Sequence, residues 1–527
     1  MGTDSARVSL ATESVERAPI APARGSLTRR AVLTAIASLL DYAAQLATTL
    51  VVTPIVVSGL GASLFGVWEM LRQAVGYMSA ADGRPMDALR LVVASEQSSA
   101  DANRLRRNVG AALAVWLVFL PVVALAGIAL VWFAPTITKV GPELETAVRF
   151  ACAFLVLAFI AGALAAIPEA VLRGMNLGYK RMGWQAALSL TGGLLAVGAL
   201  SLGLGVWGLG AAQLALAAIT GLCFVLLAKR YVPALGVARP SKSEVTSLLR
   251  MSAWLTGGLV LTNLLLASDV LILGMVVSPV VVATYVLTGA AARMSVTLFN
   301  FTVGATTAGL GGLIGQREYE RATEIRHHLV TLTWLFVTIV GSTILMWNRS
   351  FVTLWVGQEH YAGLWANLLI VCVMVQTAFI RGDAFVIDAA LRPRPRVIVT
   401  AIAAALTIAA TLTLTPVLGI VGLCAGILVG RLPQTLAYPW LVASCLHRER
   451  RVPLARAARQ LGVMALLFGG AAWLGQRVTA QNWLEWTAAS AVTGAMVCAL
   501  ALVLGLPANV RQAIVRRTLA TGRAFRA

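Results

Sequence analysis

The residues that could do chemistry are ionisable side chains inside long apolar stretches. Two acids, Asp41 and Asp269, and three arginines, Arg293, Arg381 and Arg431, interrupt such stretches. A charge at the centre of a membrane helix costs about 2.5–3.5 kcal/mol on insertion scales, so it normally faces a cavity or a partner. Each of these residues is therefore a candidate functional residue.

The three arginines favour an anionic ligand. None of them has an acid three or four positions away, where a helix would bring the two side chains together. A guanidinium can bind a phosphate group through two parallel hydrogen bonds. The alternative for all three is ion pairing across helices, with the acids Asp41, Asp269 and Asp383 as partners.

Asp41 and Asp269 could couple transport to an ion. A carboxylate inside the bilayer can bind a proton or Na⁺, although pairing with an arginine of a neighbouring helix is an equal alternative for Asp41. Arg72 is a fourth candidate phosphate ligand, but Glu69 lies three residues before it and could neutralise it.

Two acid–base pairs recur at equivalent places near the expected cytoplasmic ends of helices. Glu169 and Arg173 are four residues apart, as are Asp388 and Arg392. Ordinary pairing at the membrane surface explains both pairs. Their recurrence also fits contacts that close an inner gate, and we keep both interpretations.

The composition requires a membrane protein. The chain has 527 residues, of which 59% are hydrophobic and only 12% charged, whereas water-soluble domains are about one quarter charged. Strong hydrophobicity in each segment indicates helices rather than a barrel. The six cysteines form no C-x-x-C pair. None of the four histidines pairs with a plausible nucleophile, and the sequence has no Gly-rich phosphate-binding loop. We therefore expect no catalytic site, metal or cofactor.

The apolar stretches predict an all-α polytopic protein with about 14 transmembrane helices. The expected spans are residues 31–58, 63–80, 109–133, 147–172, 183–204, 208–228, 250–274, 280–312, 329–347, 362–390, 397–416, 419–444, 460–475 and 485–507. Spans 280–312 and 362–390 exceed a simple crossing, so they should tilt, kink or protrude.

The positive charges predict the orientation. With the amino terminus inside, 34 of the 42 Lys and Arg residues fall in cytoplasmic segments, four in the opposite loops and four within spans. This asymmetry places both termini in the cytoplasm. It also explains the formal charge of +20 without nucleic acid as a partner.

An internal repeat is offset by about 216 residues. EAVLR from Glu169 recurs as DAALR from Asp388, and GVWGL from Gly205 recurs as GIVGL from Gly419. The unit contains six spans, so both copies have the same topology and should enclose a central cavity that opens to either side in turn. The expected segments are a cytoplasmic tail (1–30), an N-terminal bundle (31–230), a linker (231–249), a C-terminal bundle (250–445), two additional helices (446–508) and a basic tail (509–527).

Three short motifs carry a family resemblance. They are Leu60-Gly61 followed by Phe65-Gly66-Val67-Trp68, Ser268-Asp269 with Leu273-Gly274 and Ala283-Thr284-Tyr285, and the stretch from Phe351 to Gly357. Over about residues 28–445 the chain resembles the multidrug/oligosaccharidyl-lipid/polysaccharide exporter superfamily, and within it the polysaccharide (O-antigen type) flippases. The resemblance implies two six-helix bundles and alternating-access export of a lipid-linked oligosaccharide across the bacterial inner membrane.

Several alternatives to this function stay open. The same superfamily contains ion-coupled multidrug antiporters and peptidoglycan-precursor flippases, and the latter also have two extra helices. A non-transporting scaffold of polysaccharide assembly is a further alternative. The expected partners are the lipid-linked substrate, a proton or Na⁺, membrane lipids and polysaccharide assembly proteins.

Overall fold

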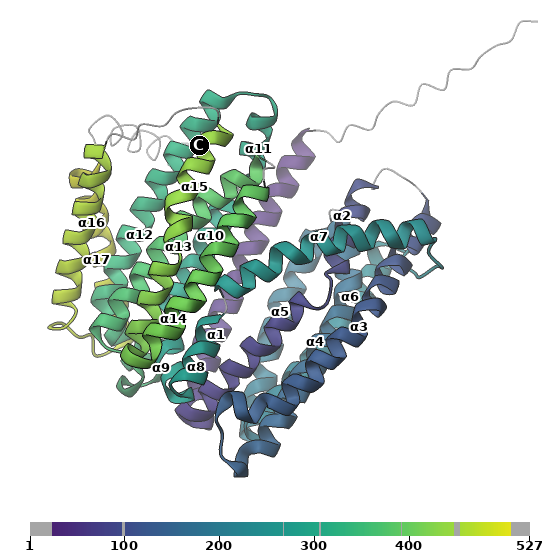
Figure 1. The fold of residues 1–527 in the computed structure, drawn as a ribbon, viewed down its shortest axis with the longest axis horizontal. Helices are drawn as coiled ribbons and strands as arrows, with labels where there is room; N and C mark the ends of the chain where they lie inside the picture. The colour runs from purple at the N-terminus through teal and green to yellow at the C-terminus, as the bar shows by residue number, and fades with distance from the viewer. Residues whose placement is uncertain are drawn as a thin grey trace, which may run out of the picture.

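The fold is almost entirely helical. A computed structural model describes residues 24–96, 101–175, 177–266, 268–304, 307–390, 393–446 and 454–506 (Figure 1), and these residues form no β-strand. Within them, ten helices are long and apolar enough to cross a membrane, or eleven if the bent pair Pro279–Thr288 and Ala290–Phe301 is one span. The all-α polytopic fold predicted from the apolar stretches is confirmed.

The first bundle consists of long helices that pack against one another, and α4 packs most extensively on α6. Its helices are α1 (Arg24–Tyr77), α3 (Ala102–Thr138), α4 (Pro142–Gly174), α5 (Gly178–Ser201) and α6 (Gly205–Tyr231). A short helix, α2 (Pro85–Ser95), lies in the segment that we expected to be a cytoplasmic loop. It buries Ala88, Leu89 and Val93, and it packs against α3 and α4.

The second bundle contains more breaks. Its helices are α7 (Lys242–Leu266), α8 (Ser268–Val276), α9 (Pro279–Thr288), α10 (Ala290–Gly304), α11 (Thr307–Gly315), α12 (Tyr319–Val356), α13 (Leu364–Ala389), α14 (Pro393–Gly430) and α15 (Leu432–Cys445). The expected long span 280–312 is bent by 52° between α9 and α10. Two further helices, α16 (Leu454–Leu474) and α17 (Trp483–Leu500), pack on α12.

Glycines in non-helical conformations divide two of the long helices. Gly61 in α1 has φ 74° and ψ 165°, and Gly419 in α14 has φ 56° and ψ −128°. Each lies where one expected span ends and the next begins, so α1 and the stretch 394–445 each contain two expected crossings. Only glycine adopts such backbone angles without strain. Gly205, the repeat equivalent of Gly419, also has positive φ (59°).

The two bundles meet near α8 and α9 and diverge toward the end where α1 begins (Figure 1). At the meeting point a buried apolar cluster combines Phe65 and Trp68 of α1 with Ala283 of α9 and Trp355 of α12. We call this region the joined end. Gly66 lets the backbones of α1 and α9 approach closely, because a Cβ there would lie 1.8 Å from the carbonyl oxygen of Pro279.

Helix α7 connects the bundles. It begins at Lys242, inside the expected linker, and contacts α2 and α3 of the first bundle as well as α14 of the second. Figure 1 shows α7 crossing from one bundle to the other. The connection between the halves is therefore a helix over much of its length, which limits how the halves can move relative to each other.

Candidate functional site

Two adjoining cavities lie in the first bundle. One, of about 380 Å³, is lined by α1, α4 and α6, and the other, of about 330 Å³, by α1, α5 and α6. They share Arg72, Gln213 and Leu216. We call the two together the first-bundle cavity.

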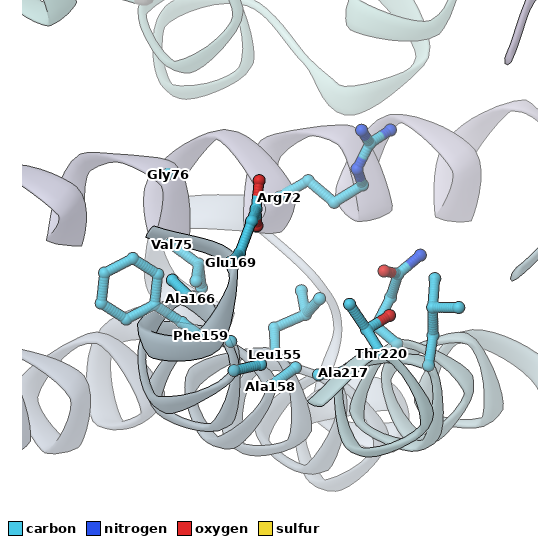
Figure 2. Close-up of a pocket in the computed structure, with 14 residues that line it drawn as sticks. Arg72, Val75, Gly76, Leu155, Ala158, Phe159, Ala166, Glu169, Ala217 and Thr220 are labelled. Atoms are coloured by element: carbon cyan, nitrogen blue, oxygen red, sulfur yellow. The ribbon is translucent and has the colours of Figure 1, made fainter. Parts of the chain in front are cut away.

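Arg72 lines this cavity and forms an ion pair with Glu69. Its Nη1 lies 2.9 Å from a carboxylate oxygen of Glu69, as the spacing of three residues predicted. The Arg72 side chain is still 54% exposed, whereas that of Glu69 is 19% exposed. Figure 2 shows Arg72 extending from α1, with Glu169 of α4 pointing toward the same helix. The guanidinium can therefore contact a ligand without leaving its carboxylate.

Of the two predicted gate pairs, the structure describes both residues of Glu169–Arg173 but only Asp388 of Asp388–Arg392. Arg173 forms a 2.9 Å ion pair with Glu169, which confirms the predicted contact. Arg392 lies outside the described residues. The carboxylate of Asp388 contacts Arg396. Asp388 and Glu169 thus both have a basic partner near the end of α13 and α4 respectively.

Asp41 lies on α1 beside Gln45, whose side-chain amide donates a 3.3 Å hydrogen bond to its carboxylate. The lining of the first-bundle cavity instead includes the hydroxyl residues Thr48, Thr49 and Thr53, further along the same helix. Asp41 therefore lies on the N-terminal side of these threonines and is not among the residues that line the cavity.

Asp269, Tyr285 and Arg293 form a chain of contacts where the second bundle is broken. The buried Tyr285 hydroxyl donates a 2.7 Å hydrogen bond to Asp269. The Arg293 guanidinium lies 5.7 Å from the centre of the Tyr285 ring and donates to the main-chain carbonyl of Val286, next to the bend between α9 and α10. Arg293 is exposed and forms no ion pair with a described residue. Pairing with Asp269, one of the expected alternatives, is not what this structure contains.

Arg381 and Arg431 lie in different surroundings. Arg431 is 5% exposed and donates a 2.9 Å hydrogen bond to Thr377, so it contributes to packing between α13 and the α14–α15 junction. This burial argues against the expected phosphate contact at Arg431. Arg381 is partly buried and makes no hydrogen bond or ion pair within the described part of the chain. It keeps its donors available for a ligand.

Sequence reasoning missed the buried partner of Asp383. Arg326, which the expected spans place in a cytoplasmic loop, is 3% exposed, and its Nη2 lies 2.6 Å from Asp383. The two residues are 57 positions apart on α12 and α13. The signal in the sequence is that Arg326 lies three residues before the start of span 329–347.

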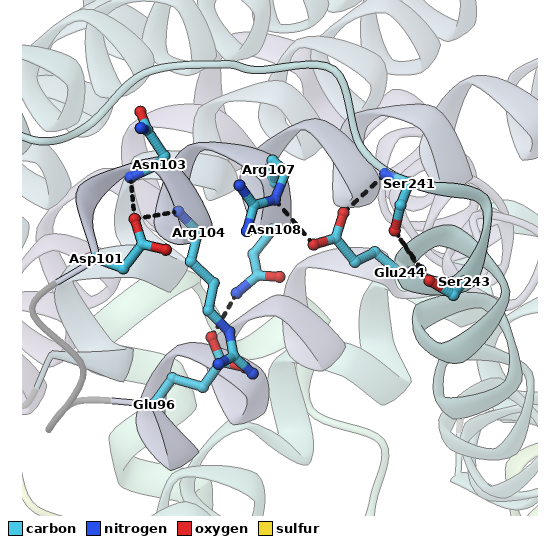
Figure 3. Close-up of polar contacts among 9 residues, drawn as sticks. All are labelled: Glu96, Asp101, Asn103, Arg104, Arg107, Asn108, Ser241, Ser243 and Glu244. Carbon is cyan, nitrogen blue, oxygen red and sulfur yellow. Dashed lines mark hydrogen bonds and ion pairs between the residues drawn. The ribbon is translucent and has the colours of Figure 1, made fainter.

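A polar network outside the spans holds α7 to α3 (Figure 3). Arg107 Nε donates a 3.0 Å hydrogen bond to Glu244, and the main-chain N–H of Ser241 donates one of 2.7 Å to the same carboxylate. These two contacts, the Ser241 N–H first, lower the pKa of Glu244. Asp101 caps α3 by accepting from the N–H groups of Asn103 and Arg104.

The fold is similar to that of solved structures described as transporters of the MOP superfamily, the superfamily that the sequence motifs resemble. No family model matches this sequence, and no curated protein matches it. Among solved structures, the inward-facing conformation of a multidrug resistance MATE family transporter of the MOP superfamily aligns with a TM-score of 0.65 and 15% identity, covering 78% of this chain and 100% of that one. The outward-facing conformation of such a transporter gives a TM-score of 0.54 with 16% identity, covering 80% and 96%.

A second kind of neighbour extends over more of the chain. The lipid II flippase MurJ, in its inward closed conformation, aligns with a TM-score of 0.63 and 11% identity. The alignment covers 93% of this chain and 100% of the flippase. These likenesses establish the fold, and the named neighbours are transporters and a flippase rather than enzymes.

Proposed function

We propose that this protein is a flippase that moves a polyprenyl-diphosphate-linked oligosaccharide across the bacterial inner membrane for polysaccharide biosynthesis. The MATE transporter matches 78% of the chain, whereas the lipid II flippase, whose cargo is lipid-linked, matches 93%. The additional coverage is consistent with a counterpart for α16 and α17. A chain of this overall size and fold therefore suits a lipid-linked cargo.

The observation that carries the proposal is the pair of arginines in the second bundle without a carboxylate partner. Arg293 and Arg381 form no ion pair with the described residues, although acids lie on neighbouring helices. A guanidinium left without a carboxylate in a membrane protein favours an anionic ligand, and a diphosphate offers several acceptors. In the proposal, Arg293, Arg381 and the exposed Arg72 hold the diphosphate.

The first-bundle cavity would receive the sugar. Its lining includes the hydroxyl residues Thr48, Thr49 and Thr53, the amide Gln213 and Trp68. Hydroxyls and amides can exchange hydrogen bonds with sugar hydroxyl groups. The polyprenyl chain would remain in the bilayer.

The orientation of the cycle follows from the charges. The end at which the bundles diverge carries the start of α1 and the basic segments, which the positive-inside rule assigns to the cytoplasm. The opposite end is closed by the cluster containing Trp68, Ala283 and Trp355. The higher TM-score to the inward-facing MATE structure supports the same assignment. Both termini would be cytoplasmic.

Ion coupling is assigned to Asp41 or Asp269, and gating to the acid–base contacts of Glu169, Arg173, Asp388 and Arg392. Binding of the coupling ion at Asp269 would change its hydrogen bond with Tyr285 and thereby the contacts at the broken helices. One charge moved through the membrane potential supplies about 2.3 kcal/mol per 100 mV.

The test is depletion of the protein followed by analysis of lipid-linked intermediates. Accumulation of the intermediate at the cytoplasmic face is expected, and wild-type protein should restore surface polysaccharide. Arg293→Ala and Arg381→Ala should fail to restore it at equal protein levels. The matched control is Arg394→Ala, an exposed arginine at the start of α14. Normal polysaccharide with both variants would contradict the phosphate role.

One observation favours a second candidate, an ion-coupled multidrug antiporter. The first-bundle cavity is lined by two carboxylates, Glu69 and Glu169, but only one guanidinium, Arg72. A cavity lined by more carboxylates than guanidinium groups would favour a cationic drug. Expression in a drug-sensitive strain separates the two functions: raised resistance to cationic dyes with unchanged lipid-linked intermediates would favour the antiporter.

A further inference from the structure

A third cavity lies in the second bundle, apart from the residues assigned above to the transported substrate. It has a volume of about 500 Å³ and is lined by α12, α13, α15 and α16. Figure 1 shows α16 beside α12 at the edge of the molecule. The lining residues lie toward the start of α12 and of α16 and toward the end of α13. Arg456, for example, is the third residue of α16. We call it the α16 pocket.

A buried ion pair lines the α16 pocket. Arg326 is 3% exposed and binds Asp383 through Nη2 at 2.6 Å. Its Nε is buried and has no hydrogen-bond partner among the described residues. A guanidinium has five N–H donors, and a buried donor without an acceptor is costly. An oxygen ligand in the pocket would give this group a partner.

Two further basic side chains also line the pocket. Arg456 is partly buried, and His327 is exposed. Nδ1 of His327 lies 2.8 Å from the carbonyl oxygen of Thr323, which places the proton on Nδ1. Asp383 cancels the charge of Arg326, so Arg456 leaves one net positive charge among the arginines and acids of the lining. That charge matches the single negative charge of a phosphodiester.

Most of the other lining residues are apolar, which indicates a lipid rather than a soluble anion. Leu329, Trp334, Phe379 and Leu461 form part of the wall. The indole N–H of Trp334 donates a 3.1 Å hydrogen bond to the carbonyl of Gln460, so α12 and α16 are joined at the pocket. Arg326 lies seven residues into α12, about 10 Å from its start at a rise of 1.5 Å per residue. That depth suits the border between headgroups and acyl chains.

We infer that the α16 pocket binds the phosphodiester headgroup of an anionic phospholipid of the surrounding leaflet, with Arg326 and Arg456 as its ligands. A bound lipid would fill the space between α16 and the six-helix bundle.

The test is native mass spectrometry of the purified full-length protein titrated with phosphatidylglycerol or phosphatidylcholine of identical acyl chains. The protein should retain phosphatidylglycerol in preference to phosphatidylcholine. Arg456→Gln, which removes a charge without touching the buried pair, should weaken phosphatidylglycerol binding about tenfold. The double variant R326Q/D383N should weaken it as well, and the control Arg394→Gln should not.

Two outcomes would overturn the inference. One is equal retention of phosphatidylglycerol by the wild type and by Arg456→Gln. The other is displacement of the lipid by glycerol phosphate at equal concentration, which would show a site for soluble anions. Neither result depends on transport, so a failure here leaves the proposed flippase function standing.

Discussion

The indole N–H of Trp355 donates a 2.7 Å hydrogen bond to the main-chain carbonyl of Leu50, a residue 305 positions earlier in the chain. In a regular helix this carbonyl would accept from the N–H of the residue four positions later, but that residue is Pro54, which has no N–H. The proline therefore leaves an acceptor in α1, and α12 of the other bundle supplies the donor. The sequence of one bundle thus creates a contact point for the other at the joined end.

We predict that Trp355→Phe loosens the joined end. The phenyl ring can keep the stacking on Phe351, whose centroid is 5.1 Å from that of the indole, but it cannot donate. Loss of a hydrogen bond of about 1 kcal/mol changes the opening equilibrium about fivefold. The measurement is the labelling rate, by a membrane-impermeant maleimide, of Ala283→Cys, a position that is fully buried in the cluster between the bundles.

The control for this variant is Trp365→Phe, because Trp365 is 68% exposed and lies outside the cluster. It should leave the labelling rate unchanged. An unchanged rate in Trp355→Phe too would mean that the contact with Leu50 does not hold the joined end.

We predict that Gly66→Ala destabilises the protein although Gly76→Ala does not. A Cβ at Gly66 would lie 1.8 Å from the carbonyl oxygen and 2.5 Å from the carbonyl carbon of Pro279, and backbone atoms cannot rotate away. At Gly76, on the same helix, a Cβ meets nothing within 4 Å. There alanine should stabilise the helix by about 0.5–1 kcal/mol. Thermal unfolding in detergent compares the two, and equal melting temperatures would refute the close approach of α1 and α9.

The fold was predictable from sequence because apolar length and glycine position are local properties. The apolar stretches predicted the helices. The GVWGL and GIVGL segments were matched only as a repeat, and the structure adds that Gly205 and Gly419, at their starts, both have positive φ angles. The pairs Glu69–Arg72 and Glu169–Arg173 were predictable for the same reason, since their spacing alone brings them together.

Contacts between distant helices were not predictable in this way. The pairing of Arg326 with Asp383 depends on the rotation of α12 relative to α13, which one sequence does not reveal. The same holds for Arg431, which looked like a cavity arginine because no acid lies near it on its own helix. It donates a hydrogen bond to Thr377, a neutral residue on another helix.

We predict that the attachment of α7 to α3 weakens in acid. The Ser241 N–H and Arg107 stabilise the charged form of Glu244 and lower its pKa in the folded protein. The stabilisation is therefore complete above the ordinary glutamate pKa of about 4.3 and is lost as the pH falls through that value toward the lowered one. Hydrogen exchange at the start of α7, corrected for intrinsic rates, should show protection at pH 7 that declines near pH 4.

The matching variants are Glu244→Gln and Glu143→Gln. The first should show reduced protection already at pH 7 and little further change in acid. Glu143 is exposed in the first turn of α4, and its replacement should leave the exchange of α7 as in the wild type. A pH-dependent loss of protection that persists in Glu244→Gln would assign the effect to another group.

We predict strong coupling between Arg326 and Asp383 in a double-mutant cycle. Removing one partner leaves the other charge buried and unpaired, at a cost of about 3–5 kcal/mol. Arg326→Gln and Asp383→Asn should therefore each lower the melting temperature markedly. The double variant leaves two neutral groups of similar size that can still hydrogen-bond, so it should be more stable than either single variant. Additive losses, with the double variant the least stable, would show that the two side chains act independently despite their 2.6 Å contact.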